Sequence, residues 1–458
     1  MHIQRDLTQG PILKQLTVLA LPIMGMSFMQ MAYNLTDMIW IGMTGSGALA
    51  AIGTAGFITW FGFAMLISTK IGVEVTVSQA LGRKDMQDAS DCSDTGYSIA
   101  MIISSSFAAL SLLAAPLIIG LFNLGIDENG FDVSSAAVIY LRLVAFGMPF
   151  SYTNQTISGV YNGYGNTKKP FMIHGIGLIV NCLLDPLLIF GLGPIPAMGV
   201  AGAAIATVIA QIIVFFVFIA DLKKMKYHLQ FSWTVLTKNL SVVKKLMKIG
   251  LPPAVQSMLF ASFAMGLARI LSEWGSTPIA VQKVGAQIEA LSWMTASGFA
   301  TALSTFIGQN YGAGNYKRIV SGYATAMKIM TVLGLTATAI LLFLSEPVFK
   351  IFLREPSVVP QGIAYLQILA VSQLFMCIEI TTAGAFNGIG KSIPPAIISI
   401  LFTGLRIPAA LLLAYSFHMG VNGVWWSISL SSVIKGTLLV AWFTYYMKKR
   451  MTIHAFQA

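Results

Sequence analysis

The stretch Gly159-Val-Tyr-Asn-Gly-Tyr-Gly165 returns 225 residues later as Gly384-Ala-Phe-Asn-Gly-Ile-Gly390. Other segments return in the same order, at offsets that drift only from 230 to 221. A preserved order with a nearly constant offset indicates that the chain consists of two related halves. The further matched segments are Leu21-Pro22 with Leu251-Pro252, Gln79–Arg83 with Gln309–Ala313, and Gly199–Gly202 with Gly420–Gly423.

The composition of both halves is that of a protein surrounded by lipid. Of 458 residues, 56% are apolar and only 10% are charged, and the mean hydropathy is +0.76. Soluble domains carry about 25% charged residues. The sequence therefore excludes a soluble enzyme, a disordered chain and a nucleic-acid-binding protein with a basic, water-exposed surface.

Twelve runs of the chain are long enough to cross a bilayer, which takes about 20 apolar residues in a helix. Six spans in each half is an even number, so the two copies share one orientation. We therefore expect an all-α polytopic membrane protein with two parallel six-helix repeats around a central cavity. The runs begin near Leu16, Leu49, Tyr97, Ser134, Phe171, Gly199, Leu246, Ile279, Val320, Gly362, Ile393 and Val421.

The basic residues predict the orientation and the division of the chain. With both termini in the cytoplasm, most of the 28 Lys and Arg lie on the cytoplasmic side, as the positive-inside rule requires. The net charge of +11 thus reports topology rather than an anionic ligand. The longest basic stretch lies at the midpoint, which predicts a six-helix lobe over 1–222, a cytoplasmic linker over 223–245 and a second lobe over 246–458.

Two acids at membrane depth are the strongest candidates for a functional site. Burying a charge in the bilayer costs at least about 2.5 kcal/mol, so such residues are usually functional. Asp37 follows Tyr33 by one helical turn, and Asp185 follows Asn181 by one turn. A carboxylate beside neutral oxygen groups suits a small hard cation or a proton.

The repeat sharpens this expectation, because the second half lacks the acids. The positions matched to Asp37 and Asp185 are Leu267 and Ala410, and the position matched to Asn181 is Arg406. We therefore expect the coupling chemistry in the N-terminal half alone.

Other charged residues within the spans have two interpretations each. Lys70 and Glu74 are four residues apart on one helix face, which fits a structural ion pair as well as a transport role. For Lys435, snorkelling to the membrane surface is the favoured interpretation.

Several motifs together resemble the multidrug and toxic compound extrusion (MATE) transporters, in their prokaryotic, NorM- and DinF-like branch. The resemblance covers nearly the whole chain. The motifs are Leu35-Thr-Asp-Met-Ile-Trp-Ile-Gly42, Asn181-Cys-Leu-Leu-Asp-Pro186, Gly202-Ala-Ala-Ile-Ala-Thr207 and Gly308-Gln-Asn-Tyr-Gly-Ala-Gly-Asn315.

The resemblance implies a twelve-helix antiporter in the plasma membrane of a prokaryote, exporting drug-like and often cationic compounds against Na+ or H+. It implies no enzymatic activity, no cofactor, no nucleic-acid partner and a monomer in the bilayer. Carried over by motif, the cation site comprises Tyr33, Asp37, Asn181, Asp185 and Thr207, with Asp37, Asn181 and Asp185 as ligands if the ion is Na+. The residues expected to touch substrate are Lys283, Gln287, Glu289, Glu379 and Arg406.

The chain departs from the pattern of some branches, which carry coupling acids in the seventh and tenth helices. No acid lies between Val255 and Leu271.

The residues leave two other functions open. A lipid-linked saccharide flippase of the same superfamily would use the basic residues Lys70, Lys283 and Arg406, whereas an intramembrane enzyme or channel has no motif in its favour.

Overall fold

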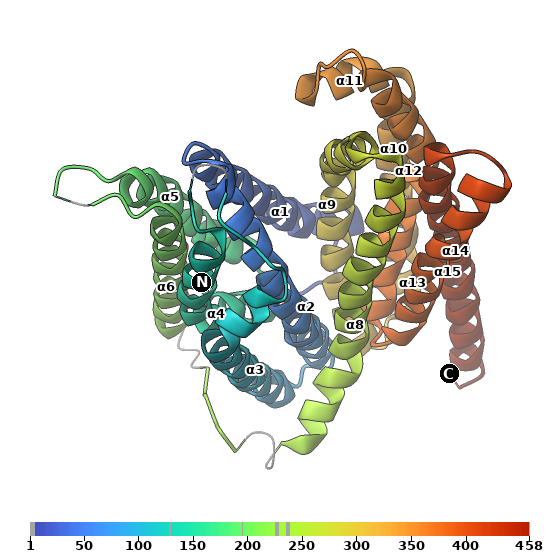
Figure 1. Cartoon of the computed structure of the whole chain (residues 1–458). Coiled ribbons are helices and arrows are strands. Elements are labelled where there is room, and N and C mark those ends of the chain that lie inside the picture. Colours follow the sequence, from blue (N-terminus) through green and yellow to red (C-terminus); the bar gives the residue numbers. More distant parts are fainter. Residues whose placement is uncertain (1–4, 128–129, 195, 225–228, 235–238, 458) are drawn as a thin grey trace. The chain divides into compact units, whose positions relative to one another are not determined.

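The computed structural model describes residues 5–127, 130–194, 196–224, 229–234 and 239–457, and these residues form helices joined by short turns (Figure 1). Residues 225–228 and 235–238 of the predicted linker lie outside the described part. The first half contains α1 (Ile12–Gly42), α2 (Ser46–Gly82), α3 (Met86–Gly120), α4 (Val133–Gly163), α5 (Lys168–Phe190) and α6 (Gly199–Lys224). The second half contains α8 (Leu240–Leu271), η1 (Ser272–Trp274), α9 (Ser276–Gly312), α10 (Tyr316–Phe343), α11 (Ser345–Phe352), α12 (Val359–Gly388), α13 (Ile393–Gly404), α14 (Arg406–Leu411), the π-helical η2 (Leu412–Ser416) and α15 (Val421–Gln457).

These helices confirm the expected all-α polytopic membrane protein. Eleven helical stretches of the described chain are long and apolar enough to cross a membrane. The remaining predicted span is α9, which has 37 residues but is more polar than the others, with a mid-helix Lys283 and Glu289. The span predicted from Ile393 is divided into α13, α14 and η2, because Pro408 has no amide hydrogen to donate to the preceding turn.

The described residues group into two compact units. The first unit comprises residues up to Asp6 and Gly25–Ala254, and the second comprises Leu7–Met24 and Val255–Ala458. Helices α1 and α8 are therefore each divided between the units. The divisions follow Met24 and Ala254, which are 230 residues apart, the offset of the matched Leu-Pro pairs.

The repeated heptapeptides lie at close contacts between two helices of one unit. A Cβ on Gly159 would lie 2.8 Å from the carbonyl oxygen of Lys70, so α4 packs directly against α2. In the second unit a Cβ on Gly384 would lie 2.4 Å from the carbonyl oxygen of Ala300. Glycine is required at both positions, and the repeat thus encodes the same helix contact in each unit.

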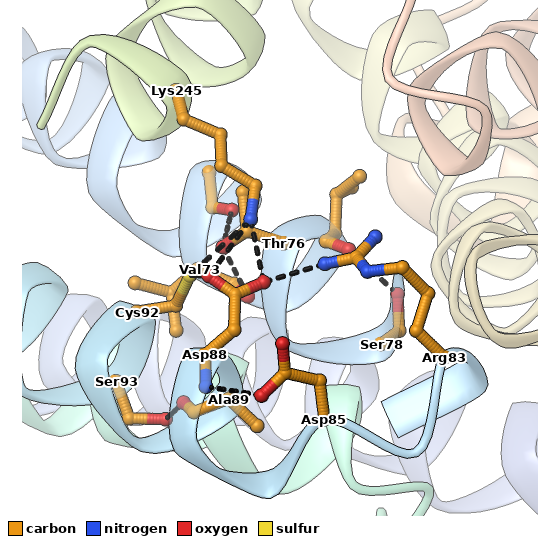
Figure 2. A network of polar contacts seen from close by, with 12 residues as sticks. Val73, Thr76, Ser78, Arg83, Asp85, Asp88, Ala89, Cys92, Ser93 and Lys245 are labelled. Carbon is orange, nitrogen blue, oxygen red and sulfur yellow. Dashed lines mark hydrogen bonds and ion pairs between the residues drawn. The ribbon is translucent and has the colours of Figure 1, made fainter. Parts of the chain in front are cut away.

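An ionic network fixes the beginning of α3 and α8 in the first unit. Figure 2 shows the carboxylate of Asp88 between Lys245 and Arg83, at 2.8 Å from the Lys245 ammonium and 2.5 Å from the Arg83 guanidinium. Asp85, which precedes α3, accepts a hydrogen bond of 2.9 Å from the backbone N–H of Asp88 and so caps the helix. The start of α8 is thereby fastened to the start of α3.

The prediction that Lys435 snorkels is wrong. Its ammonium lies 3.0 Å from the Glu379 carboxylate, and the two side chains are only 6% and 10% exposed. The ion pair joins α15 to α12 inside the second unit. A carboxylate on a neighbouring helix compensates the buried charge, so the side chain has no need to reach the membrane surface.

Candidate cation site and its relatives

Helix α5 places Asn181 and Asp185 on one buried face, as their spacing predicts. Neither residue has exposed surface, and the Asn181 side-chain amide donates a hydrogen bond of 3.1 Å to Asp185 Oδ1. The other oxygen of each side chain, Asn181 Oδ1 and Asp185 Oδ2, has no hydrogen-bond partner in the described part of the chain. Both oxygens are therefore available to a ligand.

Helices α1 and α6 bring the other predicted residues to this face. The Asp37 carboxylate of α1 interacts with Asp185 and Asn181, and Tyr33 lies one turn earlier on the same helix. Thr207 of α6 interacts with Tyr33. The structure thus brings together all five residues that the sequence predicts for the cation site, in the first unit.

Five oxygens of this cluster are buried and make no hydrogen bond of good geometry among the described residues, although Asp37 lies close to Asp185 and Tyr33 close to Thr207. A buried polar atom left unpaired costs about 1–3 kcal/mol, more if it is charged. Carboxylate, amide and hydroxyl oxygens are the ligands that small hard cations prefer. A cation or a proton would satisfy the cluster, which fits binding of either. The five atoms are Tyr33 OH, Asp37 Oδ1, Asn181 Oδ1, Asp185 Oδ2 and Thr207 Oγ1.

Sequence reasoning missed one member of the cluster, Tyr140 of α4. Its phenol interacts electrostatically with both Asp37 and Asp185. The repeat contains a signal that could have found it, because Tyr140 is matched to Tyr365 at the offset of 225. The Tyr365 hydroxyl donates a hydrogen bond of 2.7 Å to Glu289, so a tyrosine accompanies a buried acid in each unit.

In the second unit, three of the residues predicted to touch substrate lie in one charged cluster. Arg406 donates hydrogen bonds to Ser431 at 2.6 Å and Ser432 at 3.0 Å, and its guanidinium interacts with Glu289 and Glu379. Together with Lys435, the cluster holds two acids and two bases. Charge balance is thus reached within the protein, in contrast to the cation site of the first unit.

The other two residues predicted to touch substrate, Lys283 and Gln287, are exposed on α9. They do not join the charged cluster. Whether they or the cluster bind substrate stays a prediction.

Comparison with known proteins decides the family. The family model MatE matches residues 22–187 and 252–412, which together make up more than half of the chain. The chain belongs to the MATE family. The two matched stretches of this MATE chain begin at Pro22 and Pro252, the same pair of positions that marks the internal repeat.

Relatives of this MATE chain share its whole length. A probable multidrug resistance protein NorM of Thermotoga maritima is 28% identical over 440 residues, which cover 94% of the chain and 92% of that protein. An FAD transporter of Shewanella oneidensis is 24% identical over 457 residues, covering 98% and 97%. The family's members are transporters and not enzymes.

Solved structures share the fold. A crystal structure of a MATE protein in complex with MaD3S superposes with a TM-score of 0.88 at 22% identity, covering 97% of this chain and 98% of that one. A MOP superfamily transporter from Pyrococcus furiosus superposes with a TM-score of 0.85 at 22% identity and 97% coverage of each chain.

Proposed function

We propose that this MATE chain is a cation-coupled antiporter that exports drug-like, often cationic organic compounds by alternating access. The observation that carries the proposal is the cluster of unpaired buried oxygens around Asp37 and Asp185. The names of the multidrug resistance relatives support the substrate class. The plasma membrane of a prokaryote as location, cytoplasmic termini and a monomeric state belong to the same proposal.

The mechanism rests on the different affinities of the cation and of the substrate for the two conformations of the transporter. Binding of Na+ or H+ at Asp37 and Asp185 offsets one of the two negative charges at this site and so favours the conformation that buries the carboxylates best. A ligand shifts a conformational equilibrium only through its different affinity for the two states. Substrate that favours the opposite conformation therefore expels the cation, and the cation gradient drives export.

A second candidate is transport of an anionic, phosphate-bearing compound. It is favoured by the relative named as an FAD transporter, and a lipid-linked saccharide flippase would share this chemistry. The buried bases Arg406 and Lys435 could serve such a headgroup, although Glu289 and Glu379 already neutralise them.

The test is gradient-driven efflux from proteoliposomes that contain the purified protein, with ethidium or FAD as substrate. Asp37→Asn should abolish ethidium efflux under an imposed Na+ or pH gradient. The matched control is Asp132→Asn, because Asp132 is an exposed N-cap residue and asparagine caps as well as aspartate. Efflux by Asp37→Asn at the rate of the control would refute the cation site, and efflux of FAD alone would favour the second candidate.

A further inference from the structure

A line of buried and partly buried polar side chains continues from the cation site toward the end of the first unit at which α5 begins. Gln211 lies one turn after Thr207 on α6. The side-chain amide of Asn154 on α4 donates to the backbone oxygen of Gln211 at 2.9 Å and to its side-chain oxygen at 3.2 Å. Asn154 is fully buried and its own Oδ1 has no partner in the described part of the chain.

The line then reaches a histidine. Ser158 follows Asn154 by one turn of α4, bonds to its backbone oxygen at 2.8 Å, and lies 3.0 Å from the Nε2 of His174. His174 precedes Asn181 by seven residues on α5, two turns or about 10 Å along the helix axis. The ring packs edge-on against Phe218 of α6.

Two charged residues of α2 extend the line. The Lys70 ammonium donates to Gln155 at 3.0 Å and interacts electrostatically with Glu74 and with His174. Asn162 donates to Glu74 at 3.4 Å, and its own Oδ1 is buried without a partner in the described residues. We name the eight residues Lys70, Glu74, Asn154, Gln155, Ser158, Asn162, His174 and Gln211 the polar ladder.

A partly exposed ion pair involves the residue next to Asn162 on α4. Tyr161, next to Asn162 on α4, donates to Asp221 at 2.8 Å, and Lys169 at the start of α5 lies 2.5 Å from the same carboxylate. The Lys169 side chain is 33% exposed. This partly exposed ion pair thus lies one residue along α4 from the ladder residue Asn162.

The second unit has the same backbone packing, with other side chains at most positions of the ladder. A Cβ on Gly163 would lie 2.9 Å from the backbone carbonyl oxygen of Glu74, and a Cβ on Gly388 would lie 2.6 Å from the backbone carbonyl oxygen of Ser304. Lys70, Glu74 and His174 have no ionisable counterpart there, so the close helix contact does not need them, whereas the position matched to Asn154 is the buried acid Glu379. The repeat matches Lys70 to Ala300, Glu74 to Ser304, Gln155 to Ile380, Ser158 to Ala383 and His174 to Ser399.

From this asymmetry we infer that the polar ladder is a proton path between the cation site and the end of the unit where α5 begins. The three ionisable groups of the ladder, Lys70, Glu74 and His174, and the two coupling carboxylates are found in the first unit and not at the matched positions of the second. A Na+ ion would meet the Lys70 ammonium on this route, whereas a proton passes between hydrogen-bonded groups. Chains of acids and histidines within membranes serve as proton relays. The inference rests on the proposed antiport and adds that the coupling ion is H+.

The transfer conserves protons at every step. His174 gains a proton at one ring nitrogen and loses one from the other, which restores a neutral ring. Water is the carrier between side chains that do not touch, and the unpaired oxygens of Asn154 and Asn162 are acceptors for it. The charged group that interacts with His174 is Lys70 of α2, and Lys70 interacts in turn with Glu74 of the same helix.

The experiment measures proton release from the lumen of proteoliposomes, seen as alkalinisation by a trapped pH-sensitive dye, when ethidium is added outside. His174→Gln retains a hydrogen-bonding side chain but cannot titrate, and Lys70→Met removes the ammonium. We expect at least a tenfold slower proton release in both variants, a flatter pH profile of that release, and ethidium affinity within twofold of the wild type. His418→Gln is the matched control, because His418 lies outside the helices in the second unit.

The outcomes separate this inference from the proposed function. Wild-type protein that exports ethidium under a Na+ gradient but not under a pH gradient would overturn the proton path and leave antiport intact. Wild-type protein that exports nothing under either gradient would contradict antiport itself. If His174→Gln does not fold, proton release by Lys70→Met and Ser158→Ala tests the path instead. Proton release by these two variants at the rate of the control would overturn the proton path.

Discussion

Arg318 Nη2 donates a hydrogen bond of 2.7 Å to Gln15 Oε1, at the positions that the repeat matches to Asp88 and Lys245. The start of α1 is thus fastened to the start of α10 in the second unit, just as the start of α8 is fastened to the start of α3 in the first (Figure 2). The link in the first unit is an ion pair, whereas in the second unit a guanidinium donates a hydrogen bond to a neutral side-chain amide. The position of the link is therefore common to both units although the side chains differ.

Replacing Arg318 by alanine should destabilise the protein by about 2–3 kcal/mol, because its guanidinium also binds the carbonyl oxygens of Leu7, Gln9 and Gly10. Unfolding in mixed detergent, followed by loss of helical circular dichroism, measures the change. The neighbouring Lys317→Ala is the control, since Lys317 is exposed and should shift stability by less than about 0.5 kcal/mol. Equal stability of the two variants would show that the link contributes nothing.

The sequence predicts the helices of this protein well. A backbone in lipid must satisfy its own hydrogen bonds and therefore forms a helix, and each such helix is visible in the sequence as a long apolar run. Pairing across helices was harder to predict. Lys435 has an apolar neighbourhood in sequence, and its partner Glu379 lies 56 residues earlier on another helix. No helical periodicity relates two such residues.

For the candidate site, spacing within one helix predicted Asn181 beside Asp185, and family motifs added Thr207. Tyr140 was missed because a tyrosine in a span is ordinarily packing or interfacial. Its proximity to the carboxylates arises from how α4 packs, which the chain order does not reveal. Comparison of the two repeats is the one sequence signal that points to it.

Removing the Tyr140 hydroxyl should weaken the cation site. Tyr140→Phe keeps the ring but deletes the group that interacts with Asp37 and Asp185, which should weaken cation binding five- to tenfold, or about 1–1.4 kcal/mol. The shift in thermal stability with added Na+ or with falling pH reports the affinity. Tyr365→Phe at the matched position of the second unit should leave this affinity within twofold, and a similar loss in both variants would argue against a specific role.

The buried ion pair of the second unit should behave as a coupled unit. Lys435→Met leaves the Glu379 charge with Arg406 alone and should cost about 3 kcal/mol, and Glu379→Gln should cost a similar amount. The double variant should cost at least about 1 kcal/mol less than the sum, because neither charge is then left unpaired. Equilibrium unfolding of the four proteins in detergent gives the cycle. Strict additivity would mean that the pair is not coupled.

A single lysine offers a way to stabilise the protein. Lys84 follows α2 with φ of +61°, a left-handed conformation that costs a side-chain-bearing residue about 1–2 kcal/mol. The matched position in the second unit is Gly314, with φ of +71° and the same backbone hydrogen bonds to the preceding helix turn. Because glycine adopts this conformation freely but loses more entropy on folding, Lys84→Gly should stabilise the protein by about 0.5–1 kcal/mol.

The reciprocal variant is Gly314→Ala, whose Cβ would meet no atom within 4 Å. It should destabilise the protein by about 1 kcal/mol through backbone strain alone. Thermal unfolding of both variants checks the pair, and a drop in melting temperature for Lys84→Gly would show that the lysine side chain makes a favourable contact that outweighs the strain.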